Sequence, residues 1–237
     1  GTGADMGEGT LNLCRLIKQK YGIEPLSHLT CIHSDKQSIL KYLKELEKSG
    51  IENILALRGD IKPGLLLSED FRYASELIEF IGQHGNFGIS AACYPEGHFE
   101  APDIVTDLKN LKKKVEAGAQ HLNTQLFFDN EDFYRFMDMV SLAGIEVPIQ
   151  AGVMPLVKRK QIERIIGLTG VKIPAKISRM LAKFGDNDMA LFDAGIAYAT
   201  EQIIDLLSYG VRGLHLYIMN NAAVAKRITQ NISSIIR

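Results

Sequence analysis

The strongest constraint on the fold is the regular spacing of short apolar segments that alternate with amphipathic ones. The apolar segments begin near Leu26, Ile54, Ile89, Leu122, Val147 and Leu214. The first four intervals, of 28, 35, 33 and 25 residues, each have the length of one strand–helix unit. The last interval spans 67 residues and has room for additional helices. Apolar strands separated by helices predict a parallel sheet covered by helices.

Helical periodicity fills the intervals between the predicted strands. We expect an opening helix over about 9–21, a long helix over about 188–210 and a closing helix after Asn221. Ser34 and Ser68 each precede polar residues and then an apolar stripe, a pattern typical of helix N-caps. The helices that follow the first and second strands are therefore predicted to begin at these serines.

Two architectures have this strand–helix alternation: an open doubly wound sheet and a barrel. A dinucleotide-binding sheet should carry Gly-x-Gly-x-x-Gly after a strand, and no predicted strand here is followed by it. We therefore predict a single α/β domain over residues 1–237, a (β/α)8 TIM-type barrel. Such a barrel needs eight strands, and this chain supplies about six. Because the chain opens on a loop-like stretch without Met, we expect two further strands to precede it.

Composition excludes several functional classes. The chain has 27 basic and 28 acidic residues and a net charge of -1, which disfavours a nucleic-acid partner. No apolar run approaches the roughly 18 residues that cross a bilayer, and no secretory signal opens the chain. The three cysteines are too few and too scattered for a disulfide framework or a zinc site. The sequence predicts a cytoplasmic protein without a membrane partner or bound metal.

Ligands of such folds bind at the carboxyl ends of the strands, where this chain places several polar residues. His28, Arg58, Tyr94 and Gln125 lie at four successive strand ends. Structural roles are alternatives: a histidine can be hydrogen-bonded within the fold, and Arg-Gly-Asp can form a simple turn. Gln125 is harder to explain structurally, because an unpaired buried amide costs about 1–3 kcal/mol.

The side chains at these ends favour a phosphate-bearing cofactor and a heterocyclic ligand. Arg58, His98 and Lys114 can donate hydrogen bonds to phosphate groups. Gln125 and Gln161 have amides that can pair with a heterocycle. Asp107, Asn110 and Lys114 share one helix face by spacing, although a solvated face explains them equally well. The chain has no Gly-x-Ser-x-Gly motif, Walker loop or metal-ligand spacing, which favours cofactor chemistry.

In this order the strand-end segments resemble those of the methylenetetrahydrofolate reductase family. The resemblance covers essentially the whole chain and rests on the segments His28–Cys31, Ala56–Asp60, Ala91–His98, Asp107–Ala119 and Thr124–Asp129. It implies an eight-stranded barrel that holds FAD and reduces 5,10-methylenetetrahydrofolate to 5-methyltetrahydrofolate by ping-pong hydride transfer. NADH or NADPH would be the electron donor, in one-carbon metabolism and methionine biosynthesis. A homo-oligomer is also implied.

The resemblance assigns roles to individual residues. The positions that match flavin contacts are His28, Leu57, Arg58, Gly59, Asp60, Tyr73, Ala74, Ala92, Tyr94, His98, Asp107, Asn110 and Lys114. Asp60 and Gln125 match catalytic positions, the first near flavin and folate and the second at the pterin. Gln161 matches a further substrate contact.

Three departures leave alternatives open. The family's first strand carries a glutamate general acid, and no matching segment is present here. Ile165 stands where some members place a phenylalanine that stacks on the nicotinamide, and Asn221 where some place an arginine. The alternatives are a subunit that takes electrons from a partner redox protein, and a folate-binding barrel without reductase activity.

Overall fold

The computed structural model describes residues 8–236, which form six strands and nine helices. These residues divide into two compact units. The first unit runs to Ala92 and includes Lys109–Leu122, and the second comprises Cys93–Leu108 and the chain from Asn123 onward. The loop-like stretch at residues 1–7 lies outside the described residues.

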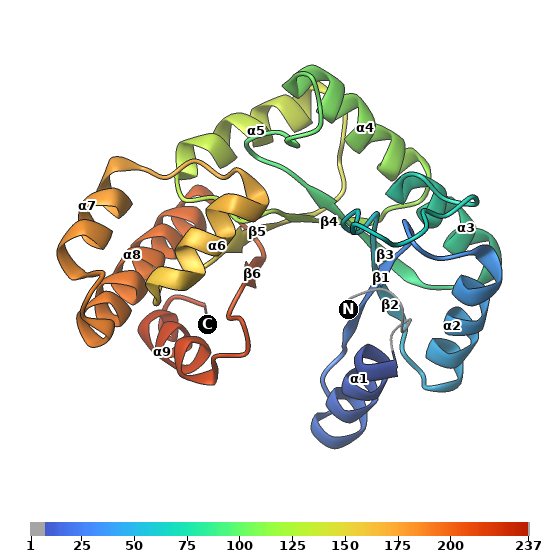
Figure 1. Cartoon of the computed structure of the whole chain (residues 1–237), viewed down its shortest axis with the longest axis horizontal. Helices are drawn as coiled ribbons and strands as arrows, with labels where there is room; N and C mark the ends of the chain where they lie inside the picture. The colour runs from blue at the N-terminus through green and yellow to red at the C-terminus, as the bar shows by residue number, and fades with distance from the viewer. Residues whose placement is uncertain (1–7, 237) are drawn as a thin grey trace. The chain divides into compact units, whose positions relative to one another are not determined.

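The first unit is built on three parallel strands. Its elements are α1 (Glu8–Tyr21), β1 (Leu26–Thr30), α2 (Lys36–Lys48), β2 (Asn53–Leu57), α3 (Ala74–His84) and β3 (Gly88–Cys93), whose last residue belongs to the second unit. β1 pairs with β2 from Leu26↔Asn53 to Thr30↔Leu57, and β2 pairs with β3. Helices α2 and α3 lie side by side (Figure 1). Their stripes of Leu and Ile are fully buried, as the amphipathic pattern predicts.

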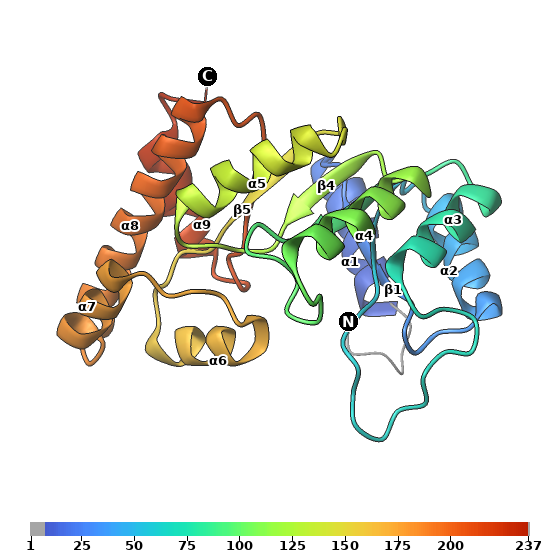
Figure 2. The same ribbon diagram turned by 90° about the horizontal axis from the view of Figure 1, so that it is seen from above.

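The second unit contains most of the remaining helices. Its elements are α5 (Asn130–Leu142), β5 (Ile149–Val153), α6 (Arg159–Thr169), α7 (Ala175–Phe184), α8 (Asp188–Tyr209), β6 (Leu214–Leu216) and α9 (Ala222–Ile232). α4 (Ile104–Glu116) and β4 (His121–Thr124) contribute to both units. β5 and β6 are parallel, from Ala151↔Leu214 to Val153↔Leu216. Figure 2 shows α7 near the start of the long α8.

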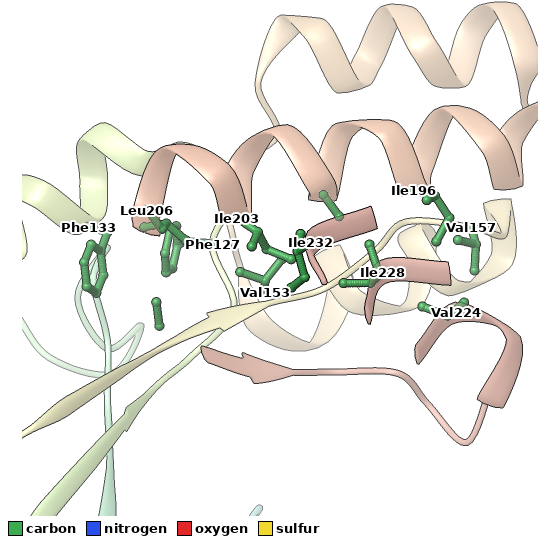
Figure 3. Close-up of a cluster of buried hydrophobic side chains, with 12 residues drawn as sticks. Phe127, Phe133, Val153, Val157, Ile196, Ile203, Leu206, Val224, Ile228 and Ile232 are labelled. Carbon is green, nitrogen blue, oxygen red and sulfur yellow. The ribbon is translucent and has the colours of Figure 1, made fainter. Parts of the chain in front are cut away.

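The core of the second unit is packed where α8 and α9 cover β5. Figure 3 shows Val153 of β5 near Ile203 of α8 and Ile228 of α9, with Ile196 and Val224 farther along the same cluster. All five side chains are at most 3% exposed. At roughly 25 cal/mol per Å² of apolar surface removed from water, burial of this size is the main force that holds the unit together.

The predicted fold class is confirmed: this is an α/β chain of the TIM-barrel type that supplies six strands. Each predicted strand lies within two residues of its expected start. Within each unit, strands that follow one another along the chain are parallel neighbours. The long interval before β6 holds three helices. No helix within residues 8–236 has the length and apolar character that crossing a membrane requires.

The two predicted serine caps are wrong. α2 is capped by Asp35, whose carboxylate accepts the Ser38 N–H at 2.7 Å. Ser68 belongs to a turn, because its hydroxyl donates to the Ser34 carbonyl and accepts the N–H of Phe71. α3 begins only at Ala74, where the Glu76 carboxylate accepts the Tyr73 N–H. In both cases a carboxylate, and not the predicted serine hydroxyl, accepts a backbone N–H where the helix begins.

Candidate functional site

In the first unit, the segment after β2 is held against the end of β1 by backbone hydrogen bonds. The Cys31 N–H is shared between the carbonyls of Leu57 and Arg58, and the Ile32 N–H donates to the Arg58 carbonyl at 2.9 Å. Gly59 then turns the chain with φ of 88°. A Cβ at Gly59 would lie 2.9 Å from the Cβ of Thr30, so this turn requires glycine.

The side chains on either side of Gly59 project from this turn. Arg58 is half-buried and its Nε donates to the Gly59 carbonyl at 3.4 Å, whereas Asp60 is exposed. The Arg58 guanidinium and the Asp60 carboxylate therefore both lie just beyond the end of β2. A guanidinium suits a phosphate, and a carboxylate accepts from a ring N–H.

His33, which was not among the predicted site residues, holds the segment that follows Asp60. Its Nδ1 lies 2.8 Å from the Leu66 carbonyl, and its Nε2 accepts the Lys62 N–H at 3.3 Å. Nε2 also lies 3.2 Å from the Asp60 carbonyl. No motif marks His33 in the sequence, because the role depends on a segment about thirty residues away.

The other cofactor candidates of the first unit differ in exposure. Lys114 of α4 is half-buried, and its Nζ donates to the Ala92 carbonyl at 2.9 Å. Asn110 lies on the same helix and is exposed. Tyr73 is 61% exposed at the start of α3, and Ala74 is buried. His28 is exposed on β1, and Leu57 is half-buried at the end of β2.

In the second unit, the loop between β3 and α4 brings together three predicted residues. The Asp107 carboxylate accepts the His98 N–H at 3.1 Å. The His98 ring contacts Tyr94 edge-on, with ring centroids 4.6 Å apart. His98 Nδ1 accepts the Glu100 N–H at 3.1 Å, which leaves the proton on Nε2. His98 therefore presents an N–H donor, and Asp107 fixes the loop that carries it.

The end of β4 places Gln125 in a rigid setting. Its N–H donates to the Cys93 carbonyl at 2.7 Å, and its Oε1 accepts the Leu126 N–H at 3.0 Å. The Nε2 donors make no hydrogen bond to the described residues of the chain. The side chain is half-buried, and its role in ligand binding stays a prediction.

Tyr217 supports this strand end from just beyond β6. Its hydroxyl donates to the Thr124 carbonyl at 2.9 Å, and the Thr124 hydroxyl accepts the Gly152 N–H at 2.7 Å. Burial, and next the negative potential of Cys93 and Tyr94, raise the pKa of Tyr217, so the phenol remains a donor. A Cβ at Gly152 would lie 2.5 Å from the Thr124 carbonyl. No local pattern in the sequence marks this role of Tyr217, because its partner is 93 positions away.

Helix α6 presents Gln161 but not Ile165. Gln161 is half-buried in the first turn, where its N–H donates to the Lys158 carbonyl at 3.1 Å. Ile165 is 7% exposed and belongs to a buried cluster with Met154, Leu156 and Ile177. Its side chain therefore serves packing.

A family model described as methylenetetrahydrofolate reductase matches residues 1–233. The chain belongs to the methylenetetrahydrofolate reductase family. It is 36% identical over 232 residues to the 5,10-methylenetetrahydrofolate reductase of Escherichia coli (strain K12), covering 97% of this chain and 78% of the relative. It is 36% identical over 250 residues to methylenetetrahydrofolate reductase (NADH) 1 of Arabidopsis thaliana, covering 99% of this chain and 42% of the plant protein.

The fold of the chain also resembles that of a solved structure. That structure is an uncharacterized protein from Clostridium thermocellum, described as binding two copies of 5-methyl-5,6,7,8-tetrahydrofolic acid. The TM-score is 0.63 at 13% identity, with 94% of this chain and 77% of the other covered. At this identity the likeness shows the fold alone.

Proposed function

We propose that the chain catalyses the FAD-dependent reduction of 5,10-methylenetetrahydrofolate to 5-methyltetrahydrofolate, with a reduced nicotinamide as electron donor. The observation that carries the proposal is the family match over residues 1–233. Family membership and the names of the relatives support methylenetetrahydrofolate reduction as the activity. The relative from Arabidopsis thaliana, whose name specifies NADH, supports a nicotinamide donor.

The residues present fit a flavin dinucleotide. Gly59 keeps the backbone at the end of β2 free of a side chain, and Arg58 and Lys114 supply cationic donors for a pyrophosphate. His98 adds an N–H donor, since its Nδ1 is already an acceptor. When bound, FAD supplies the two-electron chemistry that protein side chains lack. The other flavin-type positions, in either unit, are proposed to shape its binding: His28, Leu57, Tyr73, Ala74, Ala92, Tyr94, Asp107 and Asn110.

Asp60 and Gln125 are the proposed catalytic residues. The exposed Asp60 carboxylate accepts from an N–H of the flavin or pterin, and its negative charge tunes the ring it contacts. The Gln125 Nε2 donors bind the pterin, since Oε1 is held by the Leu126 N–H. Gln161 is proposed as a further substrate contact. Gln125 and Gln161, which both belong to the second unit, are proposed to orient the substrate, because a fixed orientation lowers the entropic cost of the reaction.

The proposal is tested with the purified protein and added FAD under anaerobic conditions. Flavin absorbance should appear in a complex that survives gel filtration, and NADH or NADPH should bleach it. Added methylenetetrahydrofolate should then restore the oxidised spectrum. Asp60→Asn and Gln125→Ala should each lower kcat/KM by about 100-fold, the loss expected for a group that acts in the transition state. Absence of FAD uptake by the folded chain would overturn the proposal.

A second candidate differs only in the electron donor. Ile165 lies in the buried cluster of the second unit, so this position offers no side chain for stacking on a nicotinamide. This observation favours a subunit that takes electrons from a partner redox protein. Stopped-flow mixing distinguishes the two candidates. Rapid flavin reduction by NADH or NADPH rules out the need for a partner protein. Reduction only by a reduced flavoprotein or iron–sulfur protein rules out a nicotinamide donor.

A further inference from the structure

Glu96, which follows β3 in the loop that carries Tyr94 and His98, contacts the segment between α6 and α7. Its Oε2 accepts the Lys172 N–H at 2.9 Å. Lys172 lies three positions beyond the end of α6 and three before the start of α7. The bond spans 76 positions of sequence within one compact unit. It therefore joins the loop after β3 to the exit of α6.

A second contact fastens the same segment to α5. Lys172 Nζ lies 3.2 Å from Oδ1 of Asp132, whose side chain is only 8% exposed. Arg135 pairs with the same carboxylate from the next turn of α5. Lys172 thus holds one acidic group through its backbone and another through its side chain. An ion pair with one buried member is worth more than an exposed one, because water screens it less.

Glu96 is in a costly environment that the backbone N–H and the charge of Lys172 partly offset. Its Oε1 is shielded from solvent and makes no hydrogen bond within residues 8–236. Burial raises the pKa of Glu96, and the charges of Asp132 and Asp129 raise it further, whereas the N–H and the positive charge of Lys172 lower it. A glutamate in this buried and partly unsatisfied environment indicates that the hydrogen bond to Lys172 has a structural role.

The other end of α6 has weaker polar support. Arg159 pairs with Asp186 and Glu163, but all three side chains are more than half exposed. Such pairs contribute about 0–1 kcal/mol. The position of α6 thus depends on its apolar face, which includes Ile162 and Ile165, and on the bonds made by Lys172.

We propose that Glu96 and Lys172 form a tether that positions α6, and with it Gln161, for folate binding. Glu96 is a positioning residue: it acts through the Lys172 backbone, and Asp132 supports the tether by holding the Lys172 side chain. The inference rests on the proposed function for the role of Gln161, but the tether itself is a property of the folded chain. Both the backbone N–H and the side-chain ammonium of Lys172 are bound, so the tether restrains this segment at two points.

The test compares Glu96→Ala, Glu96→Gln and Lys172→Met in the full chain. Lys176→Met is the matched control: it removes an exposed lysine four residues along, whose ion pair with Glu201 is more than half exposed at both ends. Glu96→Gln keeps an oxygen that accepts the Lys172 N–H and removes the repulsion from Asp132. The readouts are hydrogen exchange of the α6 amides, FAD content, and KM and kcat for methylenetetrahydrofolate.

Glu96→Ala should speed exchange in α6 about tenfold, the effect of losing a hydrogen bond worth about 1.4 kcal/mol. KM should rise about tenfold, with kcat and FAD content within about twofold of the unaltered chain. Glu96→Gln should restore both values to within about twofold, and Lys176→Met should change neither. Lys172→Met should give an intermediate rise in exchange, which provides the test if Glu96→Ala does not fold.

Two results would overturn the tether. One is unchanged α6 exchange in Glu96→Ala, and the other is faster exchange throughout β4 and β5 as well, which indicates a general loss of stability. Faster α6 exchange with an unchanged KM would overturn the substrate-positioning role. If the unaltered chain takes up no FAD and reduces no folate, the proposed function fails, while the exchange measurement still decides whether the tether exists.

Discussion

The two units support their candidate site residues by different means. In the first unit, the end of β2 is held by backbone hydrogen bonds to Cys31 and Ile32 and by the positive φ of Gly59, and Asp60 projects into solvent. In the second unit, the end of β4 is held by the half-buried Tyr217 and by the close approach of Gly152. Substitutions in the first unit should therefore act locally on ligand binding, and those in the second should act on the stability of the unit.

The largest effect is expected for Gly152→Ala. The new Cβ would lie 2.5 Å from the buried Thr124 carbonyl and 2.9 Å from the half-buried Tyr217 ring. Overpacking of this kind costs about 3 kcal/mol. Urea unfolding should show the loss. Gly167→Ala in α6 is the control, because nothing lies within 4 Å of its Cβ, and it should gain up to about 1 kcal/mol. Equal effects of the two changes would contradict the tight packing of β4 against β5.

Gly59→Ala should give the next largest effect and should show it in ligand binding. Its φ of 88° and the 2.9 Å approach to Thr30 Cβ combine strain with a close contact at the surface. We expect a loss of about 1–2 kcal/mol in unfolding free energy and a weaker FAD complex, measured by flavin fluorescence titration. Gly64→Ala has a similar φ of 82° with nothing within 4 Å, so it isolates the strain. Identical FAD affinity in both variants would contradict the claim that the close contact of Gly59 with Thr30 matters for FAD binding.

The same contrast explains what the sequence could predict. The six strands, the α/β class and the ordered strand-end motifs depend on local periodicity and spacing, and the strands and the class are confirmed. His33, Tyr217 and the Glu96–Lys172 bond depend on partners 29 to 93 positions away and have no local pattern. The serine cap at Ser68 failed for a related reason, since its hydroxyl binds the Ser34 carbonyl 34 positions away. The cap at Ser34 failed because the neighbouring Asp35 carboxylate accepts the Ser38 N–H.

Tyr217→Phe tests the side-chain support of the second unit with a smaller change. It removes only the hydroxyl that donates to the Thr124 carbonyl at 2.9 Å. The expected loss is about 1 kcal/mol of unfolding free energy, with a lower kcat/KM for methylenetetrahydrofolate because Gln125 follows Thr124 directly. Tyr209→Phe, at a half-exposed ring of the same unit, is the control and should stay within about 0.5 kcal/mol. A larger effect at Tyr209 would show that the hydroxyl of Tyr217 is not the support.

The smallest effect should appear in the pH dependence of the second unit. Burial raises the pKa of Glu96 above its usual 4.5, with Asp132 and Asp129 adding to the shift and with the N–H and the charge of Lys172 opposing it. Between 4.5 and the raised value, the folded chain binds a proton that the unfolded chain does not, so stability rises as the pH falls and is lost as the pH rises through the raised value. Urea unfolding of the unaltered chain and Glu96→Gln at several pH values measures this. The unaltered chain should gain stability relative to the variant as the pH falls toward 4.5. Protonation removes the buried, repelled charge of Glu96, whereas a glutamine does not titrate. A relative loss over that range would mean that the Lys172 N–H stabilises the carboxylate more than burial and repulsion disfavour it.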